Sequence, residues 1–63
     1  MWKKTAKKLI NDYKELKDIE RLENVKTLID LEMFLSKTEK NRNEWLDIYN
    51  LCDNIIKQIK EEK

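Results

Sequence analysis

The sequence predicts an all-α fold, a small three-helix domain in which a helical hairpin carries a bent or broken first arm. The 63-residue chain contains neither glycine nor proline, which excludes glycine turns and most tight hairpins between strands. Apolar residues make up 40% of the chain and charged residues 43%. The apolar residues recur at spacings of three and four, which is typical of amphipathic helices and argues against disorder. We expect residues 1–63 to form a single helical domain.

The segment 19–35, IERLENVKTLIDLEMFL, carries two apolar stripes and organises the predicted fold. One stripe contains Ile19, Leu22, Val25, Ile29 and Met33. A second contains Leu28, Leu31 and Leu35, and Phe34 lies apart from both. A helix on the surface of a protein needs only one apolar stripe. We therefore expect this helix to lie between two others, each covering one stripe.

The first helix is predicted from about Trp2 to Leu16. Its apolar residues share one face at 100° per residue: Trp2, Ala6, Leu9, Ile10, Tyr13 and Leu16. The stripe loses its phase after Leu16, which predicts a bend or a short break at residues 17–20. Asp18 is the candidate N-cap of the helix that follows. One unbroken helix from Trp2 to Ser36 is the alternative interpretation.

A turn is predicted in the segment 36–43, SKTEKNRN, which contains no large apolar residue. Two capping-box patterns overlap there, Ser36 with Glu39 and Asn41 with Glu44. The second pattern directly precedes the next apolar run, so the third helix is expected from about Asn43 to Lys60. Its stripe contains Trp45, Ile48, Cys52, Ile55 and Ile59, and is widened by Tyr49 and Ile56. Cys52 lies in the middle of this stripe and is expected to be a buried, unreactive thiol.

The residue types argue against an enzyme. The chain has no histidine and one cysteine, so it lacks the usual general base near neutral pH, the commonest zinc ligand and any intrachain disulfide. The carboxylates lie on predicted solvent faces without a pocket that would shift their pKa values. We expect no catalytic residue, metal or cofactor. We also expect a cytoplasmic protein, because no run of about 18 apolar residues and no signal-peptide core is present.

Three apolar residues lie off the predicted stripes and suggest a further contact surface: Phe34, Leu46 and Leu51. A chain of this size buries only about 60% of its unfolded surface, and closed twofold pairing is the commonest way to bury more. The leading hypothesis is a small, non-enzymatic protein-interaction or regulatory module that forms a homodimer. Its protein partner has no signature in the sequence.

The N-terminus is the second candidate surface. Residues 1–8 include four lysines and no acid: Lys3, Lys4, Lys7 and Lys8. Cations in the first turn of a helix oppose its macrodipole, so their placement suggests contact with an anion. The alternative function is therefore a nucleic-acid-binding accessory protein. A net charge of +1 is low for that class. The competing explanation, which we favour, is a frayed and solvated terminus, or pairing of these lysines with the acidic middle of a second, antiparallel chain.

Residues 6–17, AKKLINDYKELK, resemble the opening helix of some phage late-transcription regulators, although the helix-turn-helix that would follow is missing. The small size and the charged, glycine-free composition are similar to those of small regulatory proteins encoded by phages or plasmids. No function follows from this resemblance beyond the general class.

Overall fold

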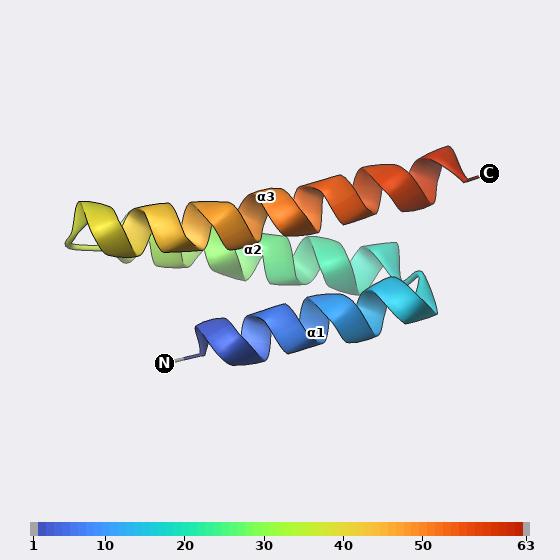
Figure 1. Ribbon diagram of the computed structural model, residues 1–63, viewed down its shortest axis with the longest axis horizontal. Helices are drawn as coiled ribbons and strands as arrows, with labels where there is room; N and C mark the ends of the chain where they lie inside the picture. The colour runs from blue at the N-terminus through green and yellow to red at the C-terminus, as the bar shows by residue number, and fades with distance from the viewer. Residues whose placement is uncertain (1, 63) are drawn as a thin grey trace.

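The computed structural model describes residues 2–62, which form three α-helices and no strand. The helices are α1 (Lys3–Leu16), α2 (Ile19–Leu35) and α3 (Glu39–Glu61). In Figure 1, α1 and α3 run side by side in the same direction, and α2 lies behind them and runs the opposite way. The bundle measures 39 × 18 × 14 Å. The predicted all-α, three-helix fold is confirmed.

The core forms on one face of α2, where both other helices pack. Leu22, Val25 and Ile29 from α2 are buried there. Against them pack Ala6 and Ile10 from α1 and, from α3, Trp45, Ile48, Cys52, Ile55, Ile56 and Ile59. The first predicted stripe of α2 is thus confirmed as core. The expectation that a second helix covers the other stripe is wrong, because α1 and α3 share the first one.

The break between α1 and α2 is confirmed, so the alternative of one unbroken helix is wrong. Lys17 has a positive φ of 53° in the left-handed region and ends α1. The backbone N–H of Asp18 donates to the carbonyl of Tyr13 at 3.0 Å, which caps the carbonyl end of α1. The Asp18 side chain then accepts from the backbone N–H of Arg21 at 3.1 Å, as an N-cap does.

The turn between α2 and α3 lies within the predicted segment, but the predicted start of the third helix is wrong. α3 begins at Glu39, and the Thr38 hydroxyl caps it by accepting from the backbone N–H of Asn41 at 3.1 Å. Neither predicted capping box is used as such. The helix extends one turn before its apolar stripe, because its first turn faces solvent and needs no apolar residue.

The ends of α1 differ in burial. Trp2, just before α1, is partly buried, and its ring lies 4.9 Å from the ring of Trp45, centroid to centroid. Its indole N–H donates to Glu32 of α2 at 2.6 Å. Leu16, predicted on the buried stripe, is instead 68% exposed. It is the last residue of α1, where the chain turns away towards α2.

Cys52 is fully buried, as predicted. Its thiol donates to the carbonyl of Leu22 at 3.2 Å and so joins α3 to α2. Burial raises the pKa of the Cys52 thiol to about 11, because the thiolate loses solvation. A thiol with so high a pKa is a poor nucleophile near neutral pH.

The Thr38 cap can be tested by mutation. Thr38→Ala should lower the free energy of unfolding by about 1 kcal/mol, since an orphan N–H at the start of α3 loses its partner. Thr27→Ala is the matched control, because the Thr27 hydroxyl bonds only to the carbonyl of Glu23 within α2. The free energy of unfolding of this control should rise by a few tenths of a kcal/mol, because alanine has a higher helix propensity than threonine. If urea denaturation showed the same loss of unfolding free energy in Thr38→Ala and Thr27→Ala, the role of Thr38 as a cap would be contradicted.

Burial of Cys52 predicts a dependence of stability on alkaline pH. The folded pKa, about 11, lies above the ordinary value of 9.0, so the fold favours the protonated thiol. Its contribution to stability is complete below pH 9 and falls as pH rises from 9 to 11, by at most about 1.4 kcal/mol per pH unit. Cys52→Ala should be less stable at pH 7 and should lack this part of the alkaline slope. Identical slopes for the two proteins in urea denaturation would refute the prediction.

Candidate functional site

Of the seven large hydrophobic residues exposed in the range 2–62, four lie on the side of α2 away from the core. Leu28, Leu31, Phe34 and Leu35 are between 50% and 85% exposed. Leu28, Leu31 and Leu35 are three or four residues apart and form the second stripe, and Phe34 follows Leu31 by three. At 100° per residue the four side chains lie within about 120° of the helix surface. We call these four residues the outer α2 face. Its stripe is visible in the sequence, and the error lay in assigning a helix to cover it.

An open hollow of about 510 Å³ adjoins this face on the side of α3. Its walls are Asp30, Leu31, Met33 and Phe34 from α2, together with Arg42 from α3. Asp30 and Arg42 form no ion pair with each other or with any other residue in the range 2–62. The hollow therefore combines apolar walls with two opposite, unpaired charges.

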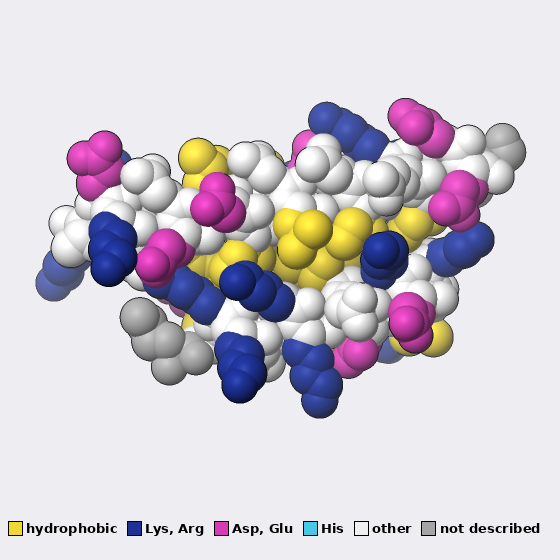
Figure 2. Space-filling model, viewed as in Figure 1, with side chains coloured by type: hydrophobic (Ala, Val, Ile, Leu, Met, Phe, Trp, Pro, Cys, Tyr) yellow, Lys and Arg dark blue, Asp and Glu magenta, His cyan; other side chains and the backbone are white. Residues whose placement is uncertain are grey.

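Leu46 and Leu51, predicted with Phe34 as a contact surface, are 42% and 45% exposed. They are five residues apart on α3, which places them about 140° apart around the helix. Leu51 lines an open groove of about 510 Å³ between α1 and α3, together with Ile48, Lys3, Lys7, Glu44 and Asp47. Figure 2 shows hydrophobic side chains along this groove, with lysines on its α1 rim. Leu51 and the outer α2 face are thus parts of different surfaces.

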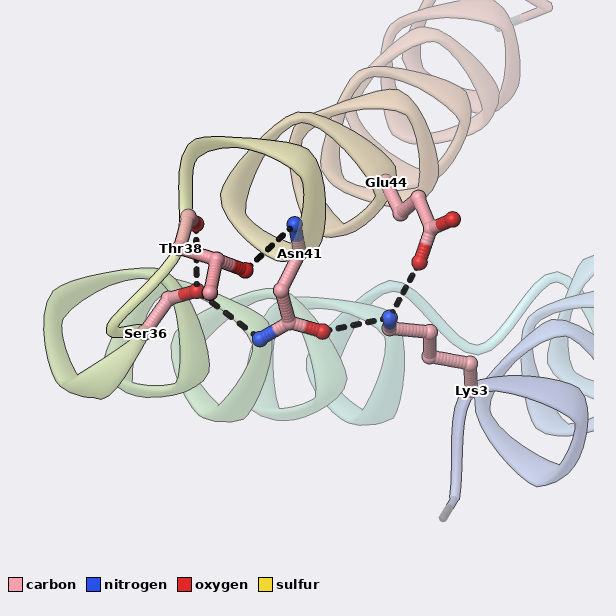
Figure 3. A network of polar contacts seen from close by, with 5 residues as sticks. All are labelled: Lys3, Ser36, Thr38, Asn41 and Glu44. Carbon is pink, nitrogen blue, oxygen red and sulfur yellow. Dashed lines mark hydrogen bonds and ion pairs between the residues drawn. The ribbon is translucent and has the colours of Figure 1, made fainter.

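The structure divides the predicted lysine cluster. The Lys3 ammonium donates to both Asn41 and Glu44 of α3 (Figure 3). It also lies 5.7 Å from the centroid of the Trp45 ring, in a cation–π position. Lys4, Lys7 and Lys8 are exposed and form no ion pair with residues 2–62.

A polar network at the start of α3 explains why Lys3 is held. The Asn41 amide donates to the Ser36 hydroxyl at 2.8 Å, and that hydroxyl donates to the carbonyl of Thr38 at 3.1 Å. Figure 3 shows the chain of contacts that joins the start of α1 to the turn between α2 and α3. The hydrogen bond from Lys3 lowers the pKa of the Glu44 carboxyl. Ser36 and Asn41 are visible in the sequence, but their pattern predicts members of capping boxes and not partners in this network.

A second set of ion pairs joins α2 to α3. The Lys26 ammonium lies 2.8 Å from one Asp53 oxygen, and Lys57 lies 3.1 Å from the other. These hydrogen bonds lower the pKa of Asp53, and the bond to Asp53 raises the pKa of Lys26. The Lys26 ammonium also lies 5.3 Å from the centroid of the Tyr49 ring. The charged groups of this cluster pair with one another, and the contact between Lys26 and Asp53 joins α2 to α3.

Between residues 2 and 62, no three side chains of His, Cys, Asp or Glu are grouped so that they could hold a metal ion. None of the helices in that range has the length and apolar character needed to cross a membrane. No known protein family, curated protein or solved structure matches the chain.

The Lys3 network predicts a specific change in acidity. Lys3→Met should keep the apolar stem of the side chain but raise the pKa of Glu44 towards its ordinary value of 4.5, because the carboxylate loses its hydrogen bond. Lys4→Met, one residue away and exposed, should leave that pKa unchanged. Carboxyl carbon shifts followed by NMR during a pH titration measure both. An unchanged Glu44 titration in Lys3→Met would show that Lys3 does not hold Glu44.

Proposed function

We propose that this chain is a small, non-enzymatic protein-interaction module that self-associates through the outer α2 face. The observation that carries the proposal is the group of four exposed neighbours: Leu28, Leu31, Phe34 and Leu35. Single exposed apolar residues are common on soluble proteins and need no explanation. Contiguous apolar patches are rarer and mark contact sites. Four such residues on one helix of a 63-residue chain favour a surface that is covered by protein.

The size of the bundle gives independent support. Its core consists of eleven buried residues, and domains of this length are marginally stable alone unless a disulfide, a metal or a second subunit assists them. The only cysteine is a free, buried thiol, so a disulfide within the chain is impossible. Association is the remaining way to add apolar burial. Association also needs no catalytic group, because a regulator of this kind acts by binding to the surface of another protein.

Sedimentation equilibrium at tens of micromolar protein, in moderate salt, tests this proposal. The wild-type chain should sediment with twice its mass of 7.8 kDa, and Leu31→Glu should sediment as a monomer because it places charge in the apolar contact. Leu16→Glu is the matched control, since Leu16 is 68% exposed, against 52% for Leu31, and lies at the end of α1. It should remain dimeric, as should Leu51→Glu in the α1–α3 groove.

Two results would contradict self-association at this face. One is a clean monomer mass for the wild-type chain under these conditions. The other is loss of assembly in Leu16→Glu or Leu51→Glu while Leu31→Glu still assembles. Far-UV circular dichroism should show unchanged helix content in every variant, because all three positions are exposed.

A second candidate function is nucleic-acid binding through α1. It is favoured by the exposed, unpaired lysines Lys4, Lys7 and Lys8 on one side of that helix. It is weakened by Lys3, the fourth member, whose ammonium already has partners in α3. The low net charge of +1 also argues against it. We rank it below self-association.

A salt titration of binding to generic duplex DNA tests this second function. If lysines of α1 contact phosphates, the logarithm of the binding constant falls with the logarithm of salt concentration, by about 0.9 per phosphate neutralised. The pair Lys4→Gln and Lys8→Gln should then reduce the slope by about two, whereas Lys37→Gln, a control in the turn before α3, should not. Absence of binding at low salt would dismiss this function.

A further inference from the structure

The hollow beside Phe34 and the exposed ring of Phe34 form a self-complementary pair of features. The Phe34 ring is 85% exposed, which is costly for so large an apolar group. The same residue forms one wall of the hollow whose other walls are Asp30, Leu31, Met33 and Arg42. A surface that carries a protruding group beside a recess can pair with a copy of itself about a twofold axis.

We propose that two copies pair through α2 in antiparallel orientation, about a twofold axis that passes between the two α2 helices, perpendicular to both, at the level of Leu31. This inference rests on the proposed self-association and adds its geometry. With the axis at Leu31, Phe34 of one copy is level with Leu28 of the other, since their numbers are equally far from 31. An axis of this kind also places the α3 side of one α2 against the α3 side of its partner. Each Phe34 ring therefore meets the edge of the partner's hollow.

The charges beside the hollow favour this orientation over a parallel one. Arg42 and Phe34 line the same hollow, so the antiparallel pair brings Arg42 of each copy towards Asp30 of the other. Neither residue has an ion-pair partner within residues 2–62. A parallel pair would instead place Arg42 near the α1 side of the partner's α2. The acid on that side is Glu32, which already accepts from Trp2.

A dimer interface of ordinary size must include the hollow as well as the outer α2 face. A specific interface buries roughly 800 Å² of each partner, which is about a sixth of the 4877 Å² surface of this chain. Four side chains on one helix supply only part of that area. The α3 edge, with Arg42 and the hollow, supplies the remainder on the side that the antiparallel pair covers. The pair is expected to be weak, with dissociation in the micromolar range.

Cysteine cross-linking tests the orientation. Asn24 is exposed on α2, seven residues before Leu31, and Lys37 is exposed in the turn, six residues after it. In the antiparallel pair, position 24 of one copy lies close to position 37 of the other, whereas two copies of position 24 lie about 21 Å apart along the helix. A short bifunctional maleimide should therefore join Asn24→Cys to Lys37→Cys in a mixture. It should join neither variant to itself, and the buried Cys52 of the wild-type chain is the control.

The outcomes separate this inference from the proposal on which it rests. A mixed cross-link without self-cross-links, seen by intact mass, supports the antiparallel pair. Self-cross-linking of Asn24→Cys at least as strong as the mixed cross-link overturns the orientation but leaves self-association standing. A monomer mass for the wild-type chain, with no cross-link of any kind, overturns both. That result would show that a second copy does not cover the outer α2 face.

Charge reversal gives a second, independent readout. Arg42→Asp should weaken self-association about tenfold, because two like-charge contacts with Asp30 replace two opposite-charge contacts in the symmetric pair. Adding Asp30→Arg to the same chain should restore most of the wild-type affinity. Lys40→Asp, also exposed and unpaired on α3, is the control and should change affinity little. Failure of the double variant to recover affinity would contradict the Asp30–Arg42 contact between copies.

Discussion

The whole bundle depends on one buried face of α2, where Leu22, Val25 and Ile29 contact residues from both other helices. The long helix α3 covers most of this face, and α1 fills the remaining side. A chain with three helices has no fourth element to place on the opposite side of α2. The exposure of Leu28, Leu31 and Leu35 is therefore a consequence of the core geometry and not an accident of composition.

Polar contacts determine which surfaces remain for binding. Lys3 joins α1 to Asn41 and Glu44, and this use of its charge removes it from the anion-binding role that its position in the sequence suggested. Lys26 is similarly held by Asp53. The outer α2 face, with its neighbouring hollow, and the outer side of α1 are among the surfaces without such contacts in residues 2–62. The first is apolar and lies beside two opposite charges, Asp30 and Arg42.

Periodicity in the sequence predicted much of the fold, because it states which residues share a face. It identified the break at Asp18, the turn after Leu35, and the burial of Cys52 and Trp45. It could not state which helix covers a given face, so it placed Leu28 and Leu31 inside. It also missed the Thr38 cap, since several neighbouring residues can cap a helix and only the path of the turn selects one. The sequence grouped Phe34 with Leu51 as one contact surface. Both are exposed, but the packing of the helices places them on different surfaces.

The central claim is that the outer α2 face is covered by protein in solution. Methyl NMR spectra recorded across the expected dissociation constant, from about one micromolar to about 100 μM protein, test it residue by residue. Methyl resonances of Leu28, Leu31 and Leu35 should move with concentration, while those of the exposed Leu16 and of Leu51 should stay constant. Constant resonances on the outer α2 face over the whole range, or movement confined to Leu51, would contradict the account.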